Sequence, residues 1–242
     1  LTTFSCRFLI PIFNSTKMGL ARSLNIGIKK SISKYIARHD ADDISSYDRL
    51  YKQLSYLENN NNISVLGSYA YKINKDGKTI GKINKKIKNK KLLYYENLLI
   101  HPSTMFVKKI FYEVGQYNEN LMVSQDYDLW IRFSQKYNLY VYPEYLIKLR
   151  IHSKSVSAIN KELQYIYSFF IGLGTLDNLV SKFIQYEKIL EFKRHYVNEL
   201  IKKNKKYSFK IKVRAMILIG EFTPLKYYNF FNPQFIIEII KF

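Results

Sequence analysis

The chain has a single cysteine, Cys6, among its 242 residues, and this scarcity excludes several classes of protein. One cysteine cannot form an internal disulfide, and no Cys/His cluster of the kind that binds zinc is present. A disulfide-rich secreted fold is therefore excluded. A reducing compartment, the cytoplasm, is the expected location.

Long hydrophobic runs are missing as well. No uninterrupted apolar run reaches the roughly 18 residues that a membrane-spanning helix needs, so no such helix is predicted. The apolar stretch 8–13 is too short for a signal peptide and lacks its layout. The chain starts at Leu1 instead of Met, which predicts a fragment, a truncated gene or an unusual start codon.

Acidic residues are few, since 19 Asp and Glu stand against 39 Lys and Arg and the net charge is +20. A surface this basic can bind nucleic acid, lie on an anionic membrane or attract phosphorylated substrates. Much of the charge falls in two lysine-rich stretches, 82–91 and 202–212. Solvated lysines under a compositional bias would explain the same charge without any partner.

The hydrophobic pattern is sufficient for a sizeable α/β core, because 47% of the residues are hydrophobic. We expect a strand at 8–13, a helix at 20–33 and a strand at 35–37 that runs into an acidic loop at 39–43. This strand–helix–strand order predicts a mostly parallel sheet flanked by helices. Ligands bind at the carboxyl ends of parallel strands, so the acidic loop is expected at a binding site.

The following residues continue the α/β pattern. A helix at 47–58 is expected to bury Leu50, Leu54 and Leu57 on one face. A hairpin is predicted in the basic stretch 72–91, which contains an Asp-Gly pair. The remaining predicted elements are a helix at 125–137 and strands at 63–71, 104–107, 139–142 and 146–151.

The character of the sequence changes near residue 158. Acidic motifs and turn signals become rare, and long apolar and basic stretches follow. We therefore expect one α/β domain over residues 1–157 and a helical, basic region over 158–242.

The motif Asp40-Ala41-Asp42-Asp43 places two carboxylates in a D-x-D pattern on the predicted acidic loop. Oxygen ligands of this type suit Mg²⁺ or Mn²⁺, which also bind substrate phosphates. Such a metal can neutralise the charge on a departing diphosphate. An acidic turn that caps the next helix, through Asp43 or Ser45, would give the same pattern.

Three further motifs could carry chemistry. Asp126, within Gln125–Trp130, could be a general base, although acidic residues also favour the first turn of a helix. His152 stands beside cationic residues and could bind a metal or phosphate. Pro102 holds His101 in an extended conformation, which could direct the imidazole into a cleft. Each residue taken alone could equally be structural or merely exposed.

The order and spacing of these motifs resemble the family 2 glycosyltransferases. The resemblance covers residues 17–157, roughly six tenths of the chain. The segments that carry it are 19–28, 35–44, Arg49-Leu50 with Gln53, 65–68, 101–106, 114–119, 125–130 and 150–157. It implies a GT-A fold and the transfer of a sugar, with inversion, from a nucleotide-sugar donor to an acceptor hydroxyl. It also implies a role in the synthesis of cell-surface polysaccharide or glycolipid.

The same resemblance implies a donor site and a metal site. Asp40, Arg22 and Asn25 would bind the donor, a UDP- or GDP-sugar. Asp42 and His152 would hold a Mg²⁺ or Mn²⁺ ion.

It further implies a base and an acceptor site. Asp126 would be the catalytic base that deprotonates the acceptor hydroxyl. His101, Gln125 and Asp128 would contact the acceptor, a glycan or a lipid-linked sugar. The basic, aromatic C-terminal region could rest on the cytoplasmic face of a membrane, although packed helices with exposed lysines would have the same composition.

One departure from the family pattern keeps other interpretations open. Family members begin with strands that bind the nucleotide base, well before the segment that corresponds to 19–28, whereas here that segment starts close to the first residue. No match to the base-binding aspartate is found, so an inactive truncated remnant is one alternative. A basic nucleic-acid-binding module is another. It explains the charge but not the acidic motifs, and no nucleic-acid-binding signature is present.

Overall fold

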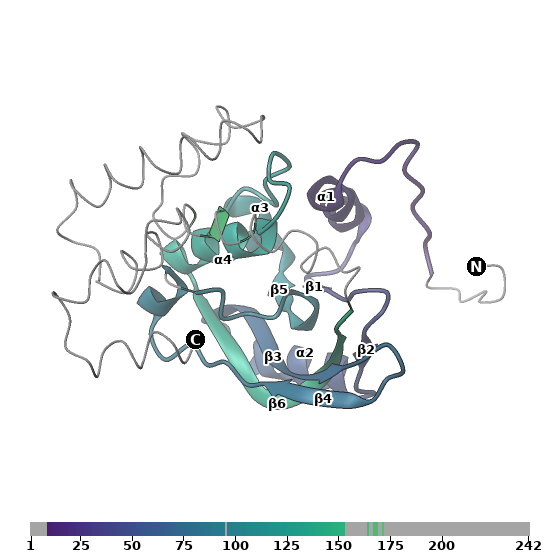
Figure 1. The fold of residues 1–242 in the computed structure, drawn as a ribbon. Coiled ribbons are helices and arrows are strands. Elements are labelled where there is room, and N and C mark those ends of the chain that lie inside the picture. Colours follow the sequence, from purple (N-terminus) through teal and green to yellow (C-terminus); the bar gives the residue numbers. More distant parts are fainter. Residues whose placement is uncertain (1–8, 95, 153–163, 165–166, 169–170, 172–242) are drawn as a thin grey trace, which may run out of the picture. The chain divides into compact units, whose positions relative to one another are not determined.

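The computed structural model describes residues 9–94, 96–152, 164, 167, 168 and 171. Figure 1 shows a central sheet with helices packed around it. In chain order the elements are α1 (Leu20–Lys30), β1 (Tyr35–Ala37), β2 (Ile44–Ser45), α2 (Arg49–Asn59), β3 (Ile63–Ile73), β4 (Thr79–Ile83), η1 (Lys90–Tyr94), η2 (His101–Ser103), β5 (Met105–Val107), α3 (Lys108–Glu113), α4 (Gln125–Lys136) and β6 (Asn138–Arg150).

The sheet is mixed, with the strand order β1-β5-β3-β6-β2 and with β4 paired to β3. Strands β3 and β6 run parallel, from Ile63 beside Asn138 to Ile73 beside Arg150. The other four pairings are antiparallel. The expected α/β class is confirmed, but the expectation of a mostly parallel sheet is wrong. The segment 84–104 between β4 and β5 contains the 3-10 turns η1 and η2, and its described residues include none of the α-helix that usually makes the crossover between parallel strands.

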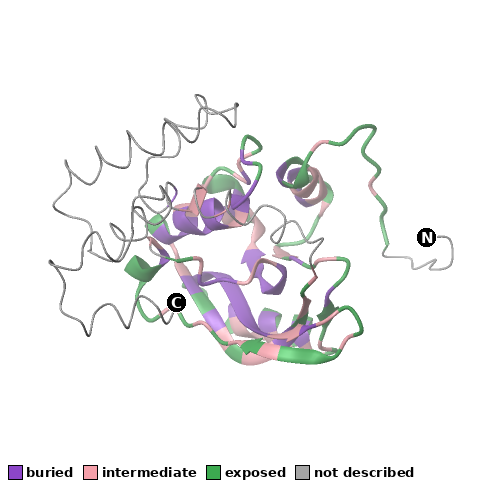
Figure 2. Ribbon diagram, viewed as in Figure 1, coloured by how far each residue is buried: buried purple, intermediate pink, exposed green. Residues whose placement is uncertain are grey.

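Helices cover both faces of the sheet, and adjacent residues of β5 contribute to opposite sides. Met105 packs with Leu57 of α2 in one hydrophobic cluster. Phe106 faces the other way, and its ring centroid lies 5.5 Å from that of Phe111 in α3 and 6.1 Å from that of Trp130 in α4. This alternation follows from the two-residue period of a strand. Figure 2 shows the buried residues concentrated on β3 and α4, between the layers.

The N-terminal expectation is only partly met. Residues 9–13 form no strand, and Ile10 and Phe13 are 74% and 85% exposed. A strand needs a neighbour that satisfies its backbone N–H and C=O groups, and β5 is the neighbour of β1 in the described sheet. The βαβ unit predicted for this region is therefore wrong over residues 9–13. The helix that follows is confirmed as α1, and β1 has the predicted bounds.

Helix α2 buries a different face from the one that its leucines predict. Leu50 and Leu54 are 57% and 40% exposed, whereas Arg49, Gln53 and Leu57 are buried. The two buried polar side chains are accommodated because they donate hydrogen bonds to the main-chain oxygens of Arg38, Leu66 and Ser103. The expected apolar face is therefore correct only for Leu57.

The basic stretch after β3 forms the predicted hairpin. Strand β4 pairs antiparallel with β3, and Gly77 takes φ 84° in the connecting turn, a conformation that favours glycine. The two strands predicted at 139–142 and 146–151 are one strand, β6. Tyr142 lies opposite Ser68 while Tyr145 lies opposite Tyr69, so Pro143 and Glu144 form an irregularity inside a continuous ladder.

The predicted helical region 158–242 lies outside the described residues, apart from 164, 167, 168 and 171. Its membrane contact and its boundary at residue 158 stay predictions. Within the part of the chain that the structure describes, no helix is long and apolar enough to cross a membrane.

The buried amide of Gln53 gives a direct test of the α2 orientation. Gln53→Leu should lower the free energy of unfolding by about 2 kcal/mol, because it leaves the main-chain oxygens of Leu66 and Ser103 without their donor. Leu50→Gln, on the exposed face, should change it by no more than about 0.5 kcal/mol. Urea unfolding of both variants measures the difference. If Leu50→Gln were the more destabilising, the face predicted from the leucines would be the buried one.

Candidate active site

The D-x-D motif lies on a tight turn that follows β1. The amide of Asp43 donates to the carbonyl of Asp40 over 3.3 Å, which closes the turn. The Asp40 and Asp42 side chains are 39% and 48% exposed, whereas Asp43 is buried. The turn therefore directs two carboxylates outward and one inward.

Asp43 is the inward carboxylate, and it joins the acidic turn to the end of β6. Its Oδ1 accepts a hydrogen bond of 2.8 Å from the amide of Arg150. Its Oδ2 is buried and has no hydrogen-bond partner among the described residues. Burial raises the pKa of Asp43 to about 6, against the opposing effect of the Arg150 hydrogen bond.

Arg150 joins the acidic turn to the β3–β4 hairpin. Its Nε donates to the carbonyl of Asp42 over 2.8 Å, and its Nη1 donates to the carbonyls of Asn74 and Lys75 over 2.9 and 2.7 Å. The guanidinium thus fixes the main chain at Asp42 against two residues of the hairpin.

Asp42 and His152, the two predicted metal ligands, are brought together in the structure. The Oδ2 of Asp42 lies 3.1 Å from the Nε2 of His152, although the residues are 110 positions apart in the sequence. Both side chains are partly exposed, so a ligand can reach them. In the described residues no group of three or more His, Cys, Asp or Glu side chains could hold a metal ion. The described chain therefore offers two candidate ligands.

Arg38 lies at the start of the acidic turn. Its Nη1 donates to the carbonyl of His39, and its Nη2 forms an ion pair with the Oδ1 of Asp40. The residue is only 8% exposed, and its Nε has no hydrogen-bond partner among the described residues. A buried cation of this kind needs a carboxylate nearby, and Asp40 supplies it.

Asp126 is in the first turn of α4, as predicted. It is half-buried, and its Oδ2 accepts a hydrogen bond of 2.8 Å from the Nδ2 of Asn97. Burial raises the pKa of Asp126, while the hydrogen bond from Asn97 and the more distant charge of Arg38 lower it. The residue just before this turn, Ser124, has φ 59° and ends the preceding loop in a left-handed conformation.

His101 lies on the same side of the sheet as Asp126 and contacts two aromatic residues. Its Nε2 is 2.8 Å from the hydroxyl of Tyr117, and its ring stands edge-on to the rings of Tyr117 and Trp130. Burial lowers the pKa of His101 to about 3; the charge of Arg38 lowers it too, and Asp40 opposes both. The imidazole is therefore neutral at physiological pH.

Arg38 also connects the two halves of the site electrostatically. Burial is the largest influence on the pKa values of Asp43, His101 and Asp126, and the charge of Arg38 acts on all three. The guanidinium is thus within electrostatic range of the acidic turn, the imidazole and the α4 carboxylate. These groups lie on separate segments of the sequence and share Arg38 as an electrostatic neighbour.

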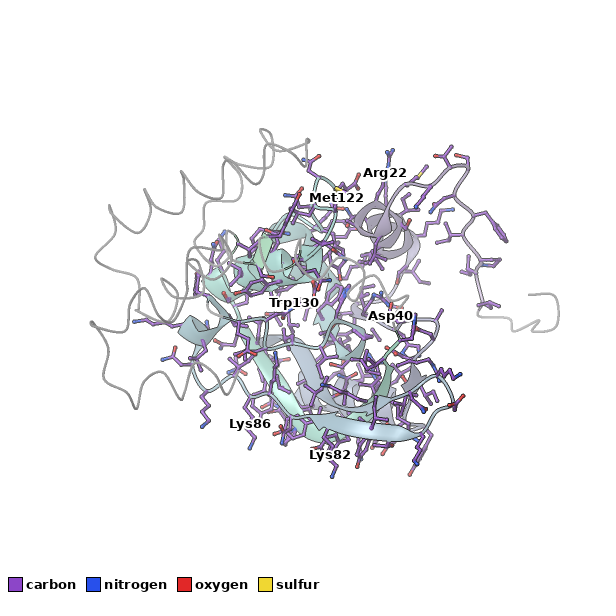
Figure 3. The ribbon with its side chains drawn as sticks, in the orientation of Figure 1. Arg22, Asp40, Lys82, Lys86, Met122 and Trp130 are labelled. Carbon is purple, nitrogen blue, oxygen red and sulfur yellow. The ribbon has the colours of Figure 1, made fainter. Side chains whose placement is uncertain are left out.

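Asn25 and Arg22, two of the predicted donor-binding residues, make contacts within the protein. Asn25 is buried and uses its whole amide within the protein, because its Nδ2 donates to the Tyr117 carbonyl and to Glu119 while its Oδ1 accepts from the Tyr117 amide. Arg22 is exposed and lies 3.8 Å from Glu119. In Figure 3, Arg22 points away from Asp40. Their donor contacts stay predictions.

The predicted acceptor residue Asp128 forms an ion pair within its own helix. Its Oδ2 lies 2.6 Å from the Nη2 of Arg132. The Nη1 of Arg132 donates to the carbonyl of Val114, and its Nη2 donates to the carbonyl of Gln116. Asp128 thereby helps to hold the turn that follows α3 against α4. Gln125 is buried at the start of the helix. Acceptor contacts for both residues stay predictions.

The sequence patterns predict no role for Arg38, Arg150 or Asn97, which contact the candidate site residues. Arg38 and Arg150 stand within the matching segments, but their contacts run to main-chain oxygens that the sequence does not reveal. Asn97 lies in a loop, 29 positions from Asp126, with no local signal that would join the two.

The fold is shared with a solved glycosyltransferase structure. S. aureus TarS 1-349, crystallised in complex with UDP, matches with a TM-score of 0.55 at 10% sequence identity, over 86% of this chain and 69% of that one. A second S. aureus TarS structure matches with a TM-score of 0.54 over 86% of this chain and 42% of that one. The expected GT-A-like fold is confirmed.

Sequence comparison identifies the family. The Glycosyl transferase family 2 model matches residues 6–115. The chain is 38% identical, over 66% of its length, to an uncharacterized glycosyltransferase of Methanocaldococcus jannaschii. It is 31% identical to the O-antigen biosynthesis glycosyltransferase WbnJ of Escherichia coli, over 71% of this chain and 70% of that protein. The chain belongs to the family 2 glycosyltransferases.

The match to several relatives is partial. The aligned region spans 57% of the Methanocaldococcus jannaschii protein and 50% of an uncharacterized glycosyltransferase of Haemophilus influenzae. It spans 56% of the amylovoran biosynthesis glycosyltransferase AmsE of Erwinia amylovora, at 28% identity.

The neutral imidazole of His101 predicts a loss of stability in acid. In the unfolded chain the imidazole has its ordinary pKa of 6.5, whereas in the folded chain its pKa is about 3. The unfolded state therefore binds more protons between these values, and the free energy of unfolding falls as the pH drops below 6.5. The fall amounts to roughly 1.4 kcal/mol per pH unit. His101→Gln should remove it. Asp43, whose folded pKa is raised, contributes in the opposite direction in both proteins.

Urea unfolding of the wild type and of His101→Gln at pH 7 and pH 5 measures this effect. The free-energy difference between them should move in favour of the variant at pH 5. A difference that stays constant between the two pH values would show that His101 already accepts a proton in the folded protein.

Proposed function

We propose that this protein transfers a sugar from a nucleotide-sugar donor to an acceptor hydroxyl with inversion of the anomeric configuration. The observation that carries the proposal is that Arg38, which forms an ion pair with Asp40 of the D-x-D turn, also acts through its charge on the Asp126 carboxylate. A donor diphosphate at the turn would leave its sugar near a carboxylate that can accept a proton. This arrangement is suited to a single displacement at the anomeric carbon.

Asp126 is the proposed general base. Its carboxylate takes the proton of the acceptor hydroxyl as the hydroxyl oxygen attacks the anomeric carbon. The bond from that carbon to the diphosphate oxygen breaks on the opposite face, and the diphosphate leaves with the bonding electrons. Burial raises the pKa of Asp126 and so increases its basicity, while the hydrogen bond from Asn97 favours the ionised form.

Asp42 and His152 are the proposed protein ligands of a Mg²⁺ or Mn²⁺ ion. One carboxylate oxygen and one imidazole nitrogen, 3.1 Å apart, fit an ion that keeps several coordination positions for waters and phosphate oxygens. When bound, the metal would neutralise charge on the departing diphosphate. Arg150 holds the main chain of Asp42 in place for this role.

The substrates are inferred from the relatives. A structure of TarS holds UDP and another holds UDP-GlcNAc, which supports a uridine nucleotide as the first donor to test, with GDP-sugars as the alternative. The names of WbnJ and AmsE place those relatives in O-antigen and amylovoran biosynthesis. They support a place in polysaccharide synthesis. The proposed acceptor is a glycan or a lipid-linked sugar, and the proposed location is the cytoplasmic face of a membrane, in the synthesis of cell-surface polysaccharide or glycolipid.

The role of the base is tested by Asp126→Asn. This change should lower kcat by at least about a hundred-fold, since an amide cannot accept the proton, while the Kd of the donor stays within about two-fold. Activity is measured as release of nucleoside diphosphate across a panel of UDP- and GDP-sugars with lipid-linked acceptors. A variant with wild-type kcat would exclude Asp126 as the base.

The metal site is tested by calorimetry of UDP-sugar binding in Mn²⁺ and then in EDTA. EDTA should weaken donor binding by at least about ten-fold, and Asp42→Asn or His152→Gln should reproduce that loss in Mn²⁺. Asp76→Asn, an exposed carboxylate in the hairpin turn, is the matched control and should bind as the wild type does. Equal affinity with and without EDTA would exclude the metal role.

A further inference from the structure

We propose that Asn97 is a positioning residue for the base, which fixes one oxygen of the Asp126 carboxylate so that the group meets the acceptor hydroxyl in one orientation. The proposal rests on the function proposed for Asp126. Its structural basis is the hydrogen bond of 2.8 Å from the Nδ2 of Asn97 to the Oδ2 of Asp126.

The orientation of the Asn97 amide is set by a second contact. Its Oδ1 accepts a hydrogen bond of 3.2 Å from the amide of Leu99. Since the oxygen is occupied by a donor on one side, the nitrogen is the end that faces Asp126. Asn97 therefore presents a donor, and not an acceptor, to the carboxylate.

The loop that carries Asn97 is anchored to α4 and to the hairpin side of the domain. The hydroxyl of Tyr127, next to Asp126 in sequence, donates to the carbonyl of Leu93 over 2.5 Å. Lys85 donates to the carbonyl of Asn97 over 2.9 Å and lies 2.7 Å from Glu96. These contacts hold the chain before Asn97 and at its own carbonyl, so its side chain can impose an orientation on the carboxylate.

An amide suits this task better than a cation. A lysine or arginine in direct contact would pair with the carboxylate and reduce its basicity strongly, whereas a neutral donor orients it without cancelling its charge. Arg38, the cation whose charge acts on Asp126, forms its ion pair with Asp40 instead. The hydrogen bond from Asn97 nonetheless lowers the pKa of Asp126 against the larger effect of burial.

A purely structural role for Asn97 can be separated from this one. As the residue that caps the turn to Leu99, Asn97 uses only its Oδ1. Asn97→Ser and Asn97→Asp both keep a side-chain acceptor for that amide. Both lose the hydrogen bond to Asp126, since an ionised aspartate has no donor and the serine hydroxyl lies one bond short of the position of the Nδ2. Asn60→Ser is the matched control, because Asn60 also donates from its Nδ2, to the carbonyl of Tyr56, far from the site.

The experiment combines a titration with kinetics on the full chain. The carboxyl carbon of Asp126 is followed by ¹³C NMR in aspartate-labelled protein and assigned by its absence in Asp126→Asn. In Asn97→Ser the midpoint of this titration, and the acid limb of the pH profile of kcat/KM, should both move to higher pH. On the plateau kcat should fall roughly ten-fold, because the carboxylate is no longer oriented. Asn97→Asp should move the titration midpoint of Asp126 and the acid limb of the kcat/KM profile to still higher pH, since two adjacent carboxylates resist joint ionisation.

Two results would exclude the positioning role of Asn97 without excluding Asp126 as the base. An unmoved Asp126 titration in Asn97→Ser, or activity lost equally at every pH, would reduce Asn97 to a turn residue while Asp126 could still be the base. Wild-type kcat in Asp126→Asn would overturn the base and the positioning role together, even if the titration moves. Asn60→Ser should leave both measurements unchanged.

Discussion

The buried guanidinium of Arg49 joins the segments on which the candidate site depends. Its Nη2 donates to the carbonyl of Arg38 over 2.6 Å, where β1 ends and the acidic turn begins, and its Nε donates to Gln53. Gln53 extends the connection to the main chain of β3 at Leu66 and of η2 at Ser103. Burial lowers the pKa of Arg49 only to about 10, so it keeps its charge at neutral pH. Helix α2 thus holds three separate segments of main chain through hydrogen bonds. These bonds are buried, and the low dielectric of the protein interior makes them stronger than they would be in water.

From this anchor the site extends in two directions. On one side the acidic turn is closed by Asp43 and Arg150, which bind it to the end of β6 and to the hairpin. On the other side η2 carries His101, which contacts Tyr117 and Trp130 of α4, and Asp126 lies in the first turn of that helix. Arg38 is the charge that both sides share. A displacement of β1 relative to α4 would therefore move the proposed metal ligands away from the proposed base, so the contacts that Arg49 and Gln53 make from α2 have a functional consequence.

Local patterns predicted much of this arrangement because they record local physics. The spacing of apolar residues predicted α1, α2 and α4, and the Asp-Gly pair predicted the hairpin, since each depends on a few neighbouring residues. Periodicity failed where burial was decided by partners distant in sequence. Leu50 and Leu54 appeared to be core residues, yet α2 buries Arg49 and Gln53 because main-chain acceptors from β1, β3 and η2 converge there.

The sequence by itself determined the family, the D-x-D turn and the position of Asp126 at a helix start, because these are patterns of adjacent residues. The tertiary structure decided which residues act together. It brought Asp42 to His152 across 110 positions and Asn97 to Asp126 across 29, and it assigned Asn25 and Asp128 to contacts within the protein. It also decided the direction of the strands around β3, which periodicity does not encode. Hydrogen bonds and ion pairs act over a few ångströms, so they depend on distances in space that only the folded chain defines.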